Sequence, residues 1–276
     1  MPLIITATNF SDVAGNAINY ACSLATNFMA EVVILHSFII PVTFSDIPLP
    51  GSVINDTQEE AEEFLAGEVN RFKEIYPEIN IKGKIIYGST VDAIDELIEE
   101  CGEPWMIVVG NSTTEQNHTW LDSTVLDAMK NSDYPILTIP PGFRYNTLKR
   151  ICFAFDNNHK GIENALKQIA NLTTTLNAEL HVLNVQKDTH NQDNIPDFNG
   201  GARIILDEVN AHYHMIFDAG NVDKAIDDFT NNNKFDLLII IPRKYGFFEN
   251  LIHKSHTNNI AHFTHIPVMA LHELKN

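Results

Sequence analysis

The sequence has few cysteines, few basic residues and no long apolar run, and each shortage excludes a class of protein. Cys22, Cys101 and Cys152 lie far apart with no CxxC pair, which favours reduced thiols over a disulfide framework or a redox site. No apolar run approaches the roughly 18 residues of a membrane-spanning helix, so we expect no membrane segment. Met1 precedes a strand pattern without a basic segment, so we expect no signal peptide and a cytoplasmic location.

Basic residues are scarcest in the first half of the chain. The 276 residues include 18 Lys and Arg against 36 Asp and Glu, a formal net charge of −18. Residues 1–144 hold 6 basic and 21 acidic side chains, whereas residues 145–276 hold 12 and 15. An acidic first half repels phosphate backbones and anionic lipid headgroups, so we expect neither nucleic acid nor a membrane as a partner.

Several catalytic motifs are missing as well. The chain contains no GxSxG, no HExxH and no GxxxxGK[ST], which are the signatures of a hydrolase nucleophile, a zinc peptidase and a P-loop. Five histidines gather near the C-terminus, at positions 253, 256, 262, 265 and 272. No cysteine or carboxylate pair joins them at the spacing of a known metal motif, so we predict no metal site.

What the sequence does contain is the same unit twice. Residues 93–95 (Ala-Ile-Asp) recur at 225–227, and the apolar run at 107–109 recurs at 239–241, both 132 residues later. Earlier matches, such as 30–31 (Ala-Glu) with 178–179, are 148 residues apart, so one interval is 16 residues shorter in the second copy. A repeat this long is a domain, because solenoid units repeat every 20–50 residues or so. We predict domains at 1–142 and 149–276.

Each copy alternates apolar runs of strand length with amphipathic helical patterns. In the first copy we predict strands at 3–8, 32–38, 79–87, 106–109 and 136–139, with helices after Ser11 or Asp12 and at 57–76, 91–101 and 123–131. In the second copy we predict strands at 151–155, 180–185, 212–217, 237–241 and 268–271, and helices at 162–176, near 202–209, at 222–231 and at 255–263. This order predicts two doubly wound α/β domains, each a five-stranded mainly parallel sheet with helices on both faces. Ligands of such sheets bind beyond the carboxyl ends of the strands.

The turns at these strand ends support a family resemblance. Asn9-Phe10-Ser11-Asp12 follows the first strand and precedes an Ala-rich helix, and Pro135 leads the last strand of the first copy. With these features the chain resembles the universal stress protein family in its tandem two-domain form, over nearly its whole length. The resemblance implies a stress-response protein whose two fifth strands pair antiparallel, which makes a pseudo-twofold dimer within one chain and covers two apolar edges. Further homodimerisation stays open.

Family members that bind ATP carry G-x2-G-x9-G-[ST] after the fourth strand. Glycines there let backbone N–H groups approach a phosphate at the start of a helix. In the first copy the middle two glycines are replaced by Thr and Ser, and Asn stands where the family has an adenine-side Asp. The ligand-binding residues predicted in the first copy are Thr8, Asn9, Ser37, Gly110, Thr113, Ser123 and Thr124.

The second copy keeps no glycine of this pattern, whose positions hold Pro242, Tyr245, Ser255 and His256. Its loop is basic instead, and a cationic loop that leads into a helix can bind an anion through side chains. The alternative is that these are solvated surface charges and that Phe247 and Phe248 close the pocket. The ligand-binding residues predicted in the second copy are Asp156, Val185, Arg243, Lys244, Lys254, Ser255, His256 and Thr257.

Together these features predict a protein that binds an adenine nucleotide, such as ATP or AMP, or another small phosphorylated ligand. The remaining glycine favours the first copy as the binding site, whereas charge favours the second, which we prefer. No base or Mg²⁺-binding carboxylate stands beside the loops, so we expect no efficient catalysis, although a slow ATPase or autophosphorylation stays open. The alternative is a scaffold or interaction protein whose degenerate pockets bind no nucleotide.

Overall fold

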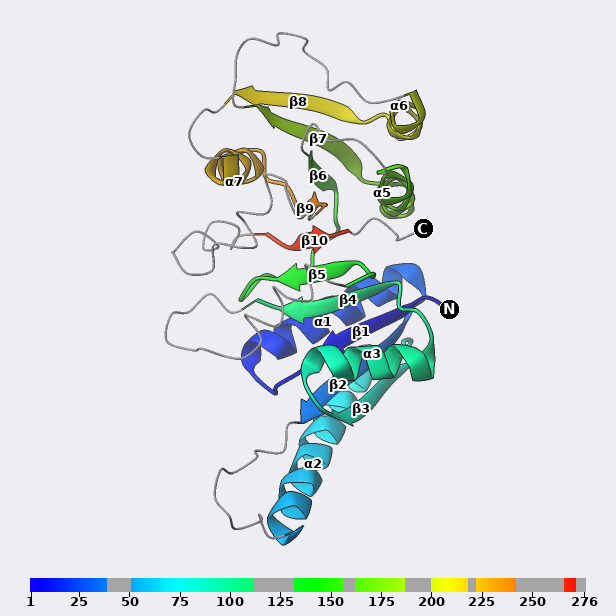
Figure 1. Ribbon diagram of the computed structural model, residues 1–276, viewed down its shortest axis with the longest axis vertical. Coiled ribbons are helices and arrows are strands. Elements are labelled where there is room, and N and C mark those ends of the chain that lie inside the picture. Colours follow the sequence, from blue (N-terminus) through cyan, green and yellow to red (C-terminus); the bar gives the residue numbers. More distant parts are fainter. Residues whose placement is uncertain are drawn as a thin grey trace. The chain divides into compact units, whose positions relative to one another are not determined.

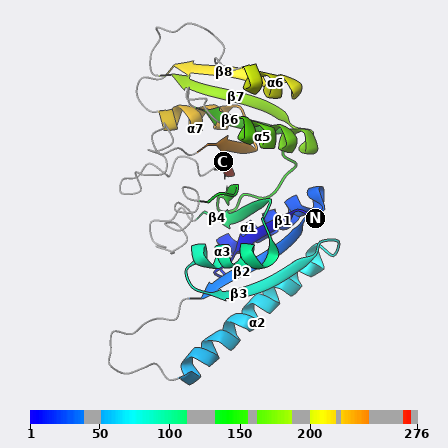
Figure 2. The same cartoon turned by 45° about the vertical axis from the view of Figure 1, so that its right-hand side comes forward.

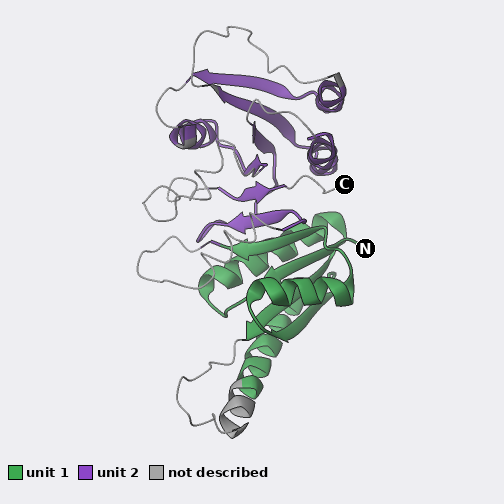
Figure 3. Cartoon of the chain, in the orientation of Figure 1, with its two compact units in different colours: residues 1–110 green, residues 111–276 purple. Residues whose placement is uncertain are grey.

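The computed structural model describes residues 1–38, 51–111, 132–155, 162–186, 200–217, 222–241 and 266–271. The chain folds into two compact units, unit 1 (1–110) and unit 2 (111–276) (Figure 3). This division falls before the domain boundary predicted near residue 142, because the strand at 136–139 pairs with a strand of the second copy. The predicted domain limits stay a prediction.

Unit 1 is a parallel sheet wound in both directions from its first strand (Figure 1). Its strands lie in the order β3-β2-β1-β4, so the direction of winding reverses between β1 and β4. The elements are β1 (Leu3–Ala7), α1 (Asp12–Phe28), β2 (Glu31–Phe38), α2 (Gly51–Ile75), β3 (Ile81–Tyr87), α3 (Thr90–Cys101) and β4 (Met106–Gly110).

Helices cover both faces of this sheet. Helix α1 contacts the end of α2, since Ser23 Oγ lies 2.6 Å from the Oη atom of Tyr76, the residue that follows α2. Helix α2 also lies along β3 (Figure 2), where a Cβ added to Gly83 would be 3.0 Å from side-chain carbons of two α2 residues. On the opposite face the buried hydroxyl of Ser37 in β2 meets Thr90 of α3 at 2.8 Å. The doubly wound arrangement predicted for this copy is therefore confirmed.

Local sequence explains where α1 begins and ends. Ser11 is its N-cap and accepts a hydrogen bond from the Ala14 backbone N–H at 3.2 Å, which satisfies a donor that the helix leaves free. Met29 ends the helix in the left-handed conformation, at φ 50°. The buried face repeats at helical spacing, as its apolar pattern predicts; it consists of Ala14, Ala17, Ile18, Tyr20, Ala21, Cys22, Leu24 and Ala25.

Unit 2 repeats the arrangement and adds one antiparallel strand. Its order is β5-β10-β9-β6-β7-β8, and β6 to β10 are mutually parallel. Strand β5 runs antiparallel to β10, and Thr138 Oγ1 donates to the carbonyl of Val268 at 3.2 Å. This confirms the predicted pairing of the two fifth strands. The elements are β5 (Ile136–Ile139), β6 (Arg150–Phe155), α5 (Glu163–Leu176), β7 (Glu179–Gln186), α6 (Gly200–Glu208), β8 (His212–Phe217), α7 (Val222–Asn232), β9 (Leu237–Ile240) and β10 (Val268–Ala270).

The predicted elements agree with these bounds to within about two residues at most ends. Helix α2 is the exception, because it begins at Gly51 rather than at residue 57; its first turns carry no regular apolar pattern. The helices predicted at 123–131 and 255–263 lie outside the described residues. No helix in the described part of the chain is long and apolar enough to cross a membrane.

Candidate ligand site at the end of the first strand

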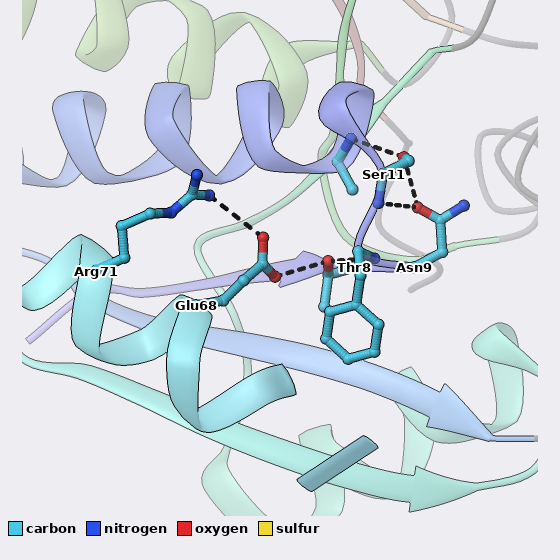
Figure 4. A network of polar contacts seen from close by, with 7 residues as sticks. Thr8, Asn9, Ser11, Glu68 and Arg71 are labelled. Atoms are coloured by element: carbon cyan, nitrogen blue, oxygen red, sulfur yellow. Dashed lines mark hydrogen bonds and ion pairs between the residues drawn. The ribbon is translucent and has the colours of Figure 1, made fainter. Parts of the chain in front are cut away.

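Thr8, at the end of β1, forms hydrogen bonds with residues of both β2 and α2. Its backbone N–H donates to the carbonyl of Leu35 at 2.8 Å, and its own carbonyl lies 2.9 Å from His36 Nδ1. The side chain is buried, and its hydroxyl donates to Glu68 Oε2 at 2.9 Å while accepting from the Phe10 N–H at 3.0 Å (Figure 4). Both hydrogen-bonding roles of the hydroxyl are used, so Thr8 holds the following turn in one conformation.

Asn9 lies in that turn and is held by Ser11. Its side-chain oxygen, Oδ1, accepts from the Ser11 backbone N–H at 3.2 Å and from the Ser11 hydroxyl at 2.6 Å (Figure 4). Because the same serine also caps α1, the amide of Asn9 is fixed relative to the start of that helix. The Asn9 amide nitrogen, Nδ2, has no hydrogen-bond partner among the residues that the structure describes.

Phe10 has a backbone conformation that aromatic residues rarely adopt. Its φ is +61°, in the left-handed region, and its N–H is held there by Thr8. The ring packs against His36 and Phe64, with centroid distances of 4.4 Å and 5.6 Å. These three residues form the aromatic cluster, in which Phe10 and His36 lie at the carboxyl ends of β1 and β2 and Phe64 belongs to α2. Phe64 is 56% exposed.

Glu68 reaches the turn from α2. Its side chain is 14% exposed and lies 3.4 Å from Arg71 Nη2, measured from Oε1 (Figure 4). Burial raises the pKa of this carboxyl group, while the hydrogen bond from Thr8 and the charges of Arg71 and His36 oppose the shift. The carboxylate is therefore committed to contacts within the protein and positions the hydroxyl of Thr8.

Gly110 brings β4 to the same place. Strands β1 and β4 pair in parallel with Thr6 opposite Val108, so Gly110 at the end of β4 lies level with Thr8. A Cβ on Gly110 would be 2.7 Å from Val13 Cγ1 and 2.8 Å from the Val13 carbonyl oxygen. Such distances are too short for any side chain, so glycine is what allows the first turn of α1 to lie against β4.

The structure thus brings together three of the residues predicted in the first copy. Thr8, Asn9 and Gly110 lie at the carboxyl edge of β1 and β4, where the winding of the sheet reverses. The hydroxyl of Ser37 instead contacts Thr90 on the α3 face. Val185 is buried in β7 of unit 2, opposite Ile216. The other predicted residues lie outside the described ranges: Thr113, Ser123, Thr124, Asp156, Arg243, Lys244, Lys254, Ser255, His256 and Thr257.

Sequence reasoning missed Glu68 and the aromatic cluster. Glu68 is 60 residues from Thr8 and is one of many acidic residues on α2, so no local pattern distinguishes it. The left-handed backbone of Phe10 is equally invisible, because turns of this kind usually carry Gly or Asn. Of this network, the sequence indicated Thr8 and Asn9 as site residues and Ser11 or Asp12 as the start of the helix.

Unit 2 contains a separate group of titratable residues near the amino ends of β7 and β8. His181 Nδ1 lies 2.9 Å from His214 Nε2, and the His181 ring centroid is 4.9 Å from that of His212. Burial lowers the pKa of His181 to about 4 and also lowers the pKa of His214. In the described ranges, no set of three or more His, Cys, Asp or Glu residues is arranged to hold a metal ion. Ligands of parallel sheets bind at the other end of the strands.

Comparison with known proteins agrees with this fold. The model of the universal stress protein family (Usp) matches residues 2–140 and again residues 147–272. A universal stress protein from Archaeoglobus fulgidus DSM 4304 has a similar structure, with 17% identity, a TM-score of 0.70, and coverage of 98% of this chain and 96% of that chain. A functionally unknown protein from Pseudomonas aeruginosa PAO1 is similar as well, with 13% identity, a TM-score of 0.58, and coverage of 99% and 93%. No curated protein matches the chain.

Proposed function

Because the chain belongs to the universal stress protein family, we propose that unit 1 binds a nucleotide or another small phosphorylated ligand and does not transform it efficiently. The binding site is the carboxyl edge of β1 and β4. In doubly wound sheets, ligands bind outside this edge at the point where the strand order reverses. Thr8, Asn9 and Gly110 lie there.

The observation that carries this proposal is the preorganised turn from Thr8 to Ser11. Its hydrogen bonds to Glu68 and to the cap of α1 fix the turn before any ligand arrives. A site that is already ordered loses less conformational entropy on binding. The amide N–H groups of Asn9 face away from Ser11 (Figure 4), where they can donate to a ligand oxygen or ring nitrogen.

The same contacts argue for binding without efficient catalysis. A general base must reach the proton that it removes, but Glu68 already accepts a hydrogen bond from the Thr8 hydroxyl and faces Arg71. Its contribution to the site is to hold the turn. We therefore assign unit 1 a sensing or sequestering role within a stress-response protein.

Isothermal titration of the full chain with ATP, ADP and AMP tests the proposal, with GMP as a fourth nucleotide. We expect saturable binding of at least one nucleotide below millimolar concentration, and a several-fold loss of affinity in Asn9→Ala. Asn146→Ala is the matched control, since Asn146 is exposed and its Oδ1 also accepts from a backbone N–H. Absence of heat and of any thermal shift at millimolar ligand would show the proposal to be wrong.

The aromatic cluster favours a second candidate, an interaction module with a closed pocket. Phe10 packs on His36 at the ends of β1 and β2, and in this alternative its ring fills the space that a ligand would need. A Phe10→Ala variant separates the two. If the ring closes the pocket, the wild type binds no nucleotide and the variant gains binding; if the pocket is open, both bind.

A further inference from the structure

The side-chain oxygen of Asn9 has no remaining capacity to accept a hydrogen bond from a ligand. An amide oxygen offers two lone pairs, and here one receives the Ser11 backbone N–H and the other the Ser11 hydroxyl. The hydroxyl has a single proton, and its oxygen accepts from the Ala14 N–H. The proton is therefore directed at Asn9, and the two residues form a closed set of bonds.

These contacts also establish which way the Asn9 amide points. A backbone N–H can only donate, so the Asn9 atom beside the Ser11 N–H must be the oxygen. The nitrogen then faces the other way, as Figure 4 shows, with its two N–H donors directed away from Ser11. To a ligand at the carboxyl edge of β1, Asn9 presents donors alone.

Because the Asn9 side chain offers a ligand only N–H donors, it recognises a different kind of base. An asparagine with both amide atoms available pairs with adenine by accepting from the 6-amino group and donating to N7. Asn9 cannot do this, and a 6-amino group facing its N–H donors would leave two buried donors unpaired, which weakens binding. A 6-oxopurine offers two acceptors on the same edge, O6 and N7, and complements the two N–H groups.

We propose that Asn9 makes the unit 1 site selective for nucleotides of 6-oxopurines, such as guanine or hypoxanthine, over those of adenine. This inference rests on the nucleotide binding proposed above and specifies its substrate class. It departs from the adenine ligand that the family resemblance implied. Glu68 and Thr8 contribute indirectly, because their hydrogen bond holds the turn that presents Asn9.

Calorimetric titration with GMP, IMP, AMP and ribose 5-phosphate tests the selectivity. We expect GMP and IMP to bind at least about tenfold more tightly than AMP, the size of effect that matched hydrogen bonds to a base edge give. IMP lacks the 2-amino group of GMP, so similar affinity for both assigns the selection to the 6-position. Ribose 5-phosphate, which has no base, should bind more weakly than either.

Asn9→Asp supplies the decisive comparison. One carboxylate oxygen can keep the bonds to Ser11 while the other turns an acceptor towards the ligand, so we expect the preference to reverse in favour of AMP. Asn146→Asp adds the same charge at an exposed position and should leave the preference unchanged. A second variant, Ser11→Ala, frees one lone pair of the Asn9 oxygen and should reduce the selectivity, which keeps the test valid if Asn9→Asp does not fold.

Three outcomes would overturn the inference. Equal affinity of the wild type for GMP and AMP contradicts it, as does an unchanged preference in Asn9→Asp. Ribose 5-phosphate binding as tightly as the nucleotides would place a phosphate, rather than a base, against Asn9. These results leave nucleotide or phosphate binding intact, whereas absence of binding by all four ligands would refute the proposed function along with the inference.

Discussion

His181, which is buried in unit 2 beside His214, should make the stability of β7 and β8 depend on pH. His181 has a side chain that is 8% exposed, and its Nδ1 lies 2.9 Å from His214 Nε2. Burial is the main cause that lowers the pKa of His181 to about 4, and Arg150 and the two neighbouring histidines act in the same direction. The carboxylate of Glu179, 3.5 Å from His181 Nε2, opposes the shift.

The direction of the effect follows from where the proton binds. Between pH 6.5 and pH 4 the unfolded chain takes up a proton at His181 but the folded chain does not, so acid favours unfolding. The contribution is complete above pH 6.5 and is lost as the pH falls to about 4. A pKa lowered from 6.5 to about 4 corresponds to a stability loss on the order of 3 kcal/mol, at about 1.4 kcal/mol per tenfold change in proton affinity.

Hydrogen exchange of the β7 and β8 amides measures this stability locally. We expect protection in the wild type to fall between pH 6.5 and pH 4. The fall should be much smaller in His181→Phe, which keeps an aromatic ring beside Phe235, whose ring centroid is 4.9 Å from that of His181. His212→Phe is the control, because His212 is exposed. Comparing variants at each pH removes the intrinsic pH dependence of exchange. If His181→Phe and the wild type lose protection equally, His181 is not the responsible group and the reasoning fails.

Three further predictions concern unit 1 and the cysteines. Gly110→Ala should lower the free energy of unfolding in urea by about 1–3 kcal/mol, because the added Cβ would overlap the first turn of α1. The control Gly67→Ala, which has nothing within 4 Å of the added Cβ, should be neutral or should stabilise by about 0.5–1 kcal/mol. Equal changes in the two variants would contradict the close contact at Gly110. A thiol reagent should modify Cys101 in the native protein and leave Cys22 and Cys152 unmodified, because both are buried and burial raises the pKa of their thiols. Mass spectrometry detects the modified residues, and rapid modification of all three cysteines would show that the core admits the reagent. Thr8→Val should lower the free energy of unfolding by about 1–3 kcal/mol, because Glu68 and the Phe10 N–H both lose their hydrogen-bond partner. An unchanged urea midpoint would mean that the turn does not need the Thr8 hydroxyl.

Most of the fold could be predicted from the sequence because its signals are local. Strand β5, predicted at 136–139, has those bounds in the structure. A short apolar run directly after Pro135 is typical of a buried strand, so its position could be predicted. The pairing of β5 with β10 was implied by the family resemblance, and it covers two apolar edge strands that would otherwise be exposed. The start of α2 did not follow, because residues 51–56 carry no regular apolar pattern that could reveal their helix.

The candidate site was predictable only in part, for physical reasons. Thr8, Asn9 and Gly110 lie at or just beyond the ends of strands whose positions the sequence indicates, so their place at the carboxyl edge could be foreseen. The contact between Thr8 and Glu68 depends on how α2 packs on the sheet, which is a property of the whole unit. The orientation of the Asn9 amide depends on two hydrogen bonds from a single serine, and residue types alone do not reveal it.

Amide NMR mapping during a nucleotide titration shows whether the ligand binds at the carboxyl edge of β1 and β4. Saturating the 276-residue chain with nucleotide should shift the backbone amide resonances of Thr8 to Ser11 and of Gly110, with smaller changes at the amino ends of β7 and β8. Binding that leaves the turn after β1 unchanged while shifting resonances elsewhere would contradict the account, because the ligand would then lie away from the edge of β1 and β4.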